Sequence, residues 1–162
     1  NSGELNLKQV YEVEGRITES GLANSGTKLL PPKCVLVGLA GQGKTRGTVA
    51  MNYVPLCTNP SVAAILPNDT YESEYLYWNL ENRYTELRKL SSGDGARGGL
   101  NLELIKSLIV YLPKKDEQLD IVKKLSTLNR KISLLEQEIV YWHLRKKALM
   151  QLLLPGIVRV SV

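Results

Sequence analysis

The spacing of hydrophobic and polar residues changes once along this chain of 162 residues. Up to about residue 112, short apolar runs alternate with Gly, Pro and Asn, which is typical of strands joined by loops. From residue 114 to residue 153 there is neither Gly nor Pro, and apolar residues recur every three or four positions. The pattern predicts a domain over 1–112, a long helix over 113–154 and a tail over 155–162.

The first region predicts a sheet of short strands. Three apolar runs, at 34–38, 47–54 and 62–66, have the length and composition of buried strands. Further candidate strands are the segments 11–13, 16–18 and 108–112.

One stretch of the first region has a helical period instead. Between residues 76 and 87, apolar residues recur at i, i+4, i+8 and i+11, which is one helical face, and Ser73 is the predicted N-cap. Asn101 is expected to cap a second, short helix over 102–106. Strands mixed with short helices predict an α+β fold with a mixed sheet, followed by a long coiled-coil helix.

The long polar–apolar pattern predicts one helix of roughly 40 residues, about 60 Å in length. Its apolar residues follow the 4-3 spacing of a heptad, interrupted by Lys146, and Pro155-Gly156 ends the pattern. Because such a narrow apolar seam requires another helix against it, the helix is predicted to pair. The predicted pairing seam consists of Ile121, Leu125, Leu128, Ile132, Leu135, Ile139, Trp142 and Leu149, and it continues to Leu153.

Composition and charge narrow the classes of function. The net charge is +5 and the isoelectric point is about 9.2, which favours an anionic partner, nucleic acid first, although the excess is small. Cys34 and Cys57 are expected to be buried thiols of a reducing compartment, in neither a metal site nor a disulfide, and the single histidine, His143, argues against a His-rich metal site. No apolar stretch reaches the roughly 18 residues that a membrane span needs, and no signal peptide is visible.

Residues 38–45 match the phosphate-binding pattern G-x-x-x-x-G-K-[ST] at every required position. A working phosphate-binding loop follows a strand and opens a helix, whose N-terminus completes the anion site. The preceding strand is expected here, but Gly47, Pro55 and the alternating residues between them favour a second strand after Thr45. We therefore expect a hairpin and no ATP binding, and nucleotide binding through Gly38–Thr45 remains an alternative.

A hairpin loop of this composition suits DNA. Gln and Arg side chains recognise the edges of adenine and guanine, whereas Lys and Thr contact phosphates. The other interpretation of this loop is a solvated polar turn. On the polar side of the predicted helix lie Arg83, Arg88 and Lys89, which either contact DNA or form a solvated face. The predicted DNA contacts are Gln42, Lys44, Thr45, Arg46 and, in the Gly-rich segment 91–99, Arg97.

An aromatic cluster between residues 71 and 78 also has two interpretations. It consists of Tyr71, Tyr75, Tyr77 and Trp78. Such rings can stack on bases, but they more often pack in the core and at its rim. Packing is therefore the favoured interpretation.

Four stretches occur together in one order over about 150 residues. They are "LLPPKCVLVGLAGQGKTRGTVAM", "VAAILPNDTYESEYLYWNLENRYTELRKL", "SSGDGARGGLNLELIKSLIVYLPKKDEQ" and, at the end of the long helix, "KKALMQLLLPGIVRV". In this order they are similar to one half of the specificity (S) subunit of type I restriction–modification systems. The similarity lies in the strand, Gly-rich loop and strand, in the following strand and helix, in the junction ending Glu117-Gln118, and in the C-terminus.

The resemblance implies a target recognition domain over 1–112 and a spacer helix that dimerises over 113–154. It implies no catalytic residues, no metal and no cofactor in this chain. Its partners would be double-stranded DNA, methyltransferase subunits that use S-adenosylmethionine to methylate adenine N6, and restriction subunits in full systems. The setting would be the cytoplasm of a bacterium or archaeon, and the role would be to direct these subunits to a bipartite target.

The sequence also departs from that family. Its S subunits usually contain two such units with antiparallel helices, whereas one unit is present here, and only about 35 residues precede the Gly-rich loop. A half-subunit, a C-terminal half and an incompletely represented chain are all compatible with this. The other hypotheses are the nucleotide-binding protein and a coiled-coil adaptor whose domain binds protein.

Overall fold

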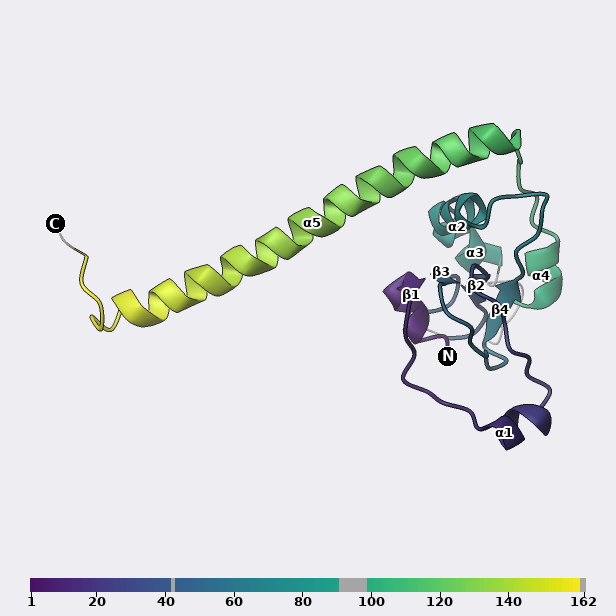
Figure 1. Ribbon diagram of the computed structural model, residues 1–162, viewed down its shortest axis with the longest axis horizontal. Helices are drawn as coiled ribbons and strands as arrows, with labels where there is room; N and C mark the ends of the chain where they lie inside the picture. Colours follow the sequence, from purple (N-terminus) through teal and green to yellow (C-terminus); the bar gives the residue numbers. More distant parts are fainter. Residues whose placement is uncertain (42, 91–98, 161–162) are drawn as a thin grey trace. The chain divides into compact units, whose positions relative to one another are not determined.

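The computed structural model describes residues 1–41, 43–90 and 99–160 (Figure 1). The chain forms two compact units, Asn1–Val122 and Lys123–Val162. The first unit is an α+β domain with a four-stranded mixed sheet, and the second contains most of a long helix, so the predicted fold class is confirmed. The assignment of roles to 1–112, 113–154 and 155–162 stays a prediction.

The sheet has the strand order β1-β3-β2-β4. β1 (Gln9–Val10) is parallel to β3 (Val49–Asn52), while β2 (Val35–Gly38) is antiparallel to both β3 and β4 (Val62–Ile65). In register, Val35 lies opposite Met51 on β3 and opposite Ile65 on β4. The three predicted buried strands are confirmed as β2, β3 and β4, of which β2 and β3 are the central strands of this sheet.

Alternate residues of the strands bury two separate faces. Val35 and Val37 of β2 pack with Val49 and Met51 of β3 on the face that also buries residues of α2 (Ser73–Asn82), α3 (Tyr84–Leu90) and α4 (Leu102–Lys106). On the other face, Leu36 packs with residues of the 3-10 turn η1 (Glu4–Leu7) and of β1. Burial on both faces explains why the central strands are almost wholly apolar.

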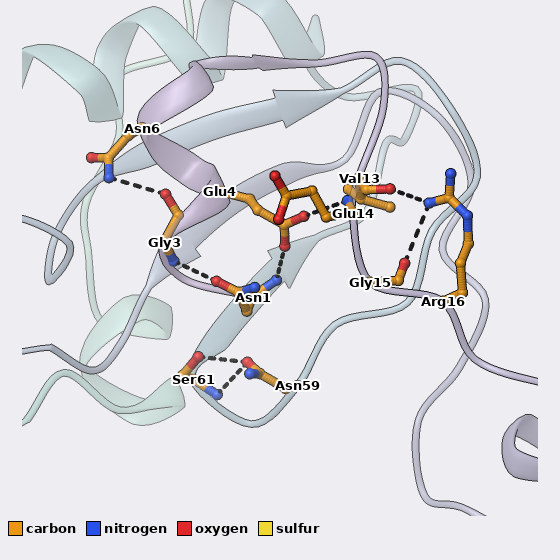
Figure 2. A network of polar contacts seen from close by, with 10 residues as sticks. All are labelled: Asn1, Gly3, Glu4, Asn6, Val13, Glu14, Gly15, Arg16, Asn59 and Ser61. Carbon is orange, nitrogen blue, oxygen red and sulfur yellow. Dashed lines mark hydrogen bonds and ion pairs between the residues drawn. The ribbon is translucent and has the colours of Figure 1, made fainter.

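Three predicted strands are absent from the described structure. The segment 11–13 and the segment 16–18 are not paired in the sheet, and Thr18 instead caps α1 (Glu19–Ala23) by accepting the N–H of Gly21 at 3.0 Å. Figure 2 shows that side chains satisfy the backbone here. Glu4 accepts the N–H of Glu14 at 3.0 Å, and Arg16 donates to the carbonyl oxygen of Val13.

The third wrong strand, 108–112, runs without a strand partner for a similar reason. The carbonyl oxygen of Ile109 accepts a hydrogen bond from Arg83 Nη1 at 2.8 Å. The carbonyl oxygen of Tyr111 accepts one from Tyr75 Oη at 2.9 Å. Helix side chains thus provide the bonds that a neighbouring strand would have made, which apolar periodicity alone does not reveal.

The helical stretch after β4 is two helices rather than one, because the chain breaks at Arg83 between α2 and α3. The predicted apolar face is buried at Leu76, Leu80 and Leu87. Ser73 is not the N-cap: that position is Glu72, which makes no side-chain capping bond. The predicted cap at Asn101 is confirmed, since its Oδ1 accepts the N–H of Leu104 at 2.8 Å.

The long helix α5 extends over Lys115–Leu153 without interruption (Figure 1). Its beginning is attached to the first unit by Gln118, which is 1% exposed. The Gln118 side chain accepts the N–H of Glu72 at 2.9 Å and donates to the carbonyl oxygen of Pro113 at 2.8 Å. The N-terminus of α2 is therefore capped by a side chain of α5.

Within the described residues, no helix is both long and apolar enough to span a membrane. Cys34 and Cys57 are free thiols. Cys34 is buried, as predicted, and burial raises the pKa of its thiol, whereas Cys57 is only partly buried. No cluster of three potential metal-ligating side chains is found among the residues that the structure describes.

Candidate nucleic-acid interface

The motif at residues 38–45 forms the loop between two adjacent antiparallel strands. Gly38, the last residue of β2, donates its N–H to the carbonyl oxygen of Thr48 at 2.9 Å and accepts the N–H of Gly47 at 2.8 Å. Turns follow Lys44 and lead directly into β3. The predicted hairpin is confirmed, and the loop lacks the following helix that a phosphate-binding loop requires.

The glycines that this loop needs coincide only in part with those of the phosphate-binding pattern. A Cβ at Gly38 would lie 2.3 Å from the carbonyl oxygen of Thr45, and Gly41 and Gly47 have φ angles of +110° and +77°. By contrast, a Cβ at Gly43, which the pattern requires, would meet nothing within 4 Å. The loop shape therefore depends on Gly38, Gly41 and Gly47, and the match at Gly43 has no steric basis.

The loop is held against α3 through its backbone. Tyr84 Oη donates to the carbonyl oxygen of Lys44 at 3.0 Å, and Arg88 Nη1 donates to the carbonyl oxygen of Gly43 at 2.6 Å. Arg88 Nη1 also donates to Tyr84 Oη at 3.0 Å. Gly47 then lies close to α3, because a Cβ there would be 3.3 Å from Arg88 Cγ.

An open hollow of about 760 Å³ lies beside the loop. It is lined by Leu39, Ala40, Gly41 and Arg46, by Pro60 and by residues 99–103. Gly99, the last residue of the Gly-rich segment 91–99, therefore lines the same hollow as the hairpin loop. Residues 91–98 of that segment lie outside the described residues.

The predicted DNA contacts are placed only in part. Lys44 is exposed, while Thr45 and Arg46 are partly buried. Thr45 Oγ1 donates to the carbonyl oxygen of Ala40 at 3.3 Å, so its hydroxyl already has a partner within the loop. Gln42 and Arg97 lie outside the described residues. The assignment of all five to DNA stays a prediction.

The basic residues of α3 and its preceding turn serve partly within the protein. Arg83 Nε donates to Glu86 at 2.7 Å, and this hydrogen bond lowers the pKa of the Glu86 carboxyl and raises the pKa of Arg83. Arg88 supports the hairpin loop, and Lys89 is exposed. No sequence pattern indicates the contact between Arg88 and the loop, because 45 residues separate Arg88 from Gly43.

The aromatic cluster packs in and against the domain core, as the favoured interpretation predicted, rather than offering its ring faces to a ligand. Tyr75 and Tyr77 are 8% and 4% exposed, and Trp78 contacts the Tyr77 ring edge-to-face at 4.9 Å between centroids. Burial raises the pKa of Tyr77 to about 12. Tyr71 donates to the carbonyl oxygen of Leu66, the residue that follows β4.

The predicted pairing seam is uncovered over most of α5. Ile121 and Leu125 are partly buried, whereas the residues that follow are about half exposed: Leu128 58%, Ile132 53%, Leu135 49%, Ile139 55%, Trp142 51% and Leu149 47%. A row of aliphatic side chains of this length in water is unfavourable at roughly 25 cal/mol per Å² of apolar area. The seam is therefore available to another helix.

Comparison with protein families gives one match. A family model described as "Type I restriction modification DNA specificity domain" matches residues 2–140. The chain belongs to this family. The match covers the sheet, the helices around it and the first part of α5. The resemblance to this family is thereby confirmed.

Two solved structures have folds that align with this chain. One, from work on complex assembly and conformational transition of the type I R-M system, has 21% identity and a TM-score of 0.64, covering 76% of this chain and 30% of its own. The other is the HsdS subunit from Thermoanaerobacter tengcongensis, with 22% identity and a TM-score of 0.52, covering 68% and 25%. The specificity domain here thus shares their fold and spans less than a third of the length of either solved chain.

Proposed function

We propose that this chain is a DNA-recognising unit of a type I restriction–modification complex, with no catalytic residues of its own. The family match over residues 2–140 is the observation that carries the proposal. The net charge of +5 agrees with a polyanionic partner, since neutralised phosphates supply much of the affinity for DNA. The hairpin loop between β2 and β3 provides an exposed basic residue on a stable scaffold.

In this proposal the loop residues have separate roles. Lys44, exposed and on a flexible stem, contacts a phosphate, as does Thr45. Arg46, which lines the hollow, and Gln42 recognise base edges, because both side chains can form paired hydrogen bonds in the major groove. Arg97 belongs to the second recognition loop.

The long helix serves assembly. Its uncovered seam pairs antiparallel with the α5 of a second copy or of another half of the S subunit. Two recognition domains joined in this way would contact the two parts of a bipartite target. Methyltransferase subunits would then bring S-adenosylmethionine, flip the target adenine out of the stack and methylate it, with restriction subunits added in full systems. The complex would work in the cytoplasm of a bacterium or archaeon.

The test is selection of duplexes from a random library by the chain assembled with its methyltransferase subunit, followed by methylation protection. Arg46→Ala is expected to relax the preference at particular base pairs, at about 1–3 kcal/mol each. Lys44→Ala is expected to weaken all sequences alike and to reduce the salt slope by about one unit.

The matched control is Lys28→Ala, which removes one positive charge from an exposed position in the segment between α1 and β2. It should leave the base preference unchanged. Failure of the unsubstituted complex to select any sequence would contradict the proposed function. Unchanged preference in both Arg46→Ala and Gln42→Ala would remove this loop from recognition and leave Arg97 as the next candidate.

A further inference from the structure

Among the described residues, three hydrogen bonds end on backbone oxygens of the β2–β3 loop, and a fourth joins two of the supporting side chains to each other. None of these four uses a loop side chain that is predicted to contact DNA. Tyr84 Oη and Thr48 Oγ1 both donate to the carbonyl oxygen of Lys44, at 3.0 and 2.8 Å. Arg88 Nη1 donates to the carbonyl oxygen of Gly43 at 2.6 Å and to Tyr84 Oη at 3.0 Å. The Arg88 guanidinium also lies 5.6 Å from the centroid of the Tyr84 ring.

These contacts fix the backbone at the residues where side chains would meet a ligand. A carbonyl oxygen held at residue 43 and another at residue 44 define the peptide planes on which the Cα atoms of Lys44 and Thr45 depend. After Thr45 and Arg46 in the sequence, Gly47 packs directly on α3. A Cβ added at Gly47 would lie 3.3 Å from Leu87 Cβ. Leu87 is fully buried, so the surface beneath the loop is part of the domain core.

We infer that Tyr84 and Arg88 of α3 are positioning residues for DNA recognition, which hold the β2–β3 loop in the conformation that presents Lys44 and Arg46. The inference rests on the proposed function, because it assigns a task to residues that support the proposed readout loop. Arg88 acts here through one nitrogen of its planar guanidinium, Nη1, which donates to a carbonyl oxygen and a hydroxyl oxygen together. The hydrogens of a guanidinium have fixed directions, which a lysine ammonium reproduces poorly. Tyr84 acts through its hydroxyl, which donates to the carbonyl oxygen of Lys44 and accepts from Arg88.

A different role for Arg88 would be a direct contact with a DNA phosphate. The two roles predict different effects of the substitution on the salt dependence of DNA affinity. Removing a phosphate contact lowers the slope of affinity against salt concentration by about one unit and affects all sequences alike. Removing a positioning contact leaves the slope unchanged and lowers the ratio of affinities for preferred and scrambled duplexes, because the loop residues then meet the base edges in poorer geometry.

The experiment measures that ratio for the chain assembled with its methyltransferase subunit. The probes are the duplex that the unsubstituted complex prefers in a random library and a scrambled duplex of the same composition, each titrated at several salt concentrations by fluorescence anisotropy. Tyr84→Phe and Arg88→Lys should each lower the ratio about three- to tenfold, the effect expected for loss of one hydrogen bond, with an unchanged salt slope. Lys89→Met, which removes a charge from the next, exposed residue of α3, is the control and should leave the ratio unchanged.

A double substitution separates positioning from general damage. If Tyr84 acts through Arg46, Tyr84→Phe should have almost no further effect on the ratio when Arg46→Ala is already present. Full additivity of the two changes would overturn the inference. An unchanged ratio in both Tyr84→Phe and Arg88→Lys would also overturn it. A third such outcome is a salt slope that falls by about one unit in Arg88→Met and returns to its original value in Arg88→Lys.

A readout without DNA keeps the inference distinct from the proposed function. Amide hydrogen exchange at residues 45–47 should become faster in Tyr84→Phe than in the unsubstituted chain, while exchange in β2 stays the same. Unchanged exchange would overturn the positioning role even if the complex binds DNA. Faster exchange together with no preferred duplex for the unsubstituted complex would overturn the recognition role and leave only a structural contact.

Discussion

Replacing Gln118 by methionine removes two of the hydrogen bonds that hold the start of α5 within the first unit, with little other change. Methionine is unbranched, nearly as long as glutamine and equally compatible with a helix. It can neither accept the N–H of Glu72, now at 2.9 Å from Gln118 Oε1, nor donate to the carbonyl oxygen of Pro113, now at 2.8 Å from Nε2. Gln118 is 1% exposed, so water does not replace either bond without rearrangement.

The magnitude follows from these two bonds. Each contributes about 0.5–1.5 kcal/mol net, and a buried polar group left without a partner costs about 1–3 kcal/mol. The buried methionine recovers a small part through apolar contacts. We therefore expect Gln118→Met to lower the free energy of unfolding by about 2–4 kcal/mol.

Urea unfolding followed by tryptophan fluorescence and circular dichroism at one fixed protein concentration measures this change. The matched control is Gln137→Met, the same substitution on the same helix at an exposed position, which should stay within about 0.5 kcal/mol of the unsubstituted chain. If Gln118→Met and Gln137→Met are equally stable, the two hydrogen bonds do not attach the helix, and the reasoning from burial fails.

Three further predictions concern the loop and the seam. Leu128→Lys together with Leu135→Lys should abolish helix pairing, seen as a smaller sedimenting species, whereas an unchanged assembly state would show that these residues do not form the seam. Equilibrium dialysis should detect no stoichiometric Mg-ATP binding, and one-to-one binding lost in Lys44→Ala would contradict the hairpin argument. Gly41→Ala should destabilise the domain by at least about 1–2 kcal/mol, because its φ angle is +110° and its Cβ would lie 1.9 Å from Thr45 Oγ1, while Gly43→Ala should be nearly neutral in the same thermal unfolding assay.

Local sequence patterns were sufficient for much of the fold. The buried strands β2, β3 and β4 were predictable because both faces of each are covered, which leaves continuous apolar runs. The long helix was predictable because neither Gly nor Pro interrupts its period. The local pattern could not exclude a strand at 108–112. Two carbonyl oxygens of this segment accept hydrogen bonds from Arg83 and Tyr75, which lie in another part of the chain.

The surroundings of the candidate site were less predictable. Sequence reasoning identified the hairpin, because Gly47 and Pro55 contradict a helix after the motif. It missed Tyr84 as a support of the loop and left Arg88 undecided between DNA and solvent, since a contact between residues 40 or more apart leaves no periodic signal. It also missed Asn52, whose buried side chain accepts the N–H of Cys34 at 2.9 Å and donates to the carbonyl oxygen of Pro31 at 2.8 Å.

The use of backbone oxygens to hold the β2–β3 loop has a consequence for how such a chain diverges over generations. Every residue has a carbonyl oxygen, so replacing the side chain at Lys44 removes neither the bond from Tyr84 nor the one from Thr48. Drift at this position is therefore uncoupled from the shape of the loop. Tyr84 and Gly47 have no such freedom, because a hydroxyl and a missing Cβ are what they contribute. Among descendants of this sequence, the side chain at position 44 is free to vary while Tyr84 and Gly47 are held constant.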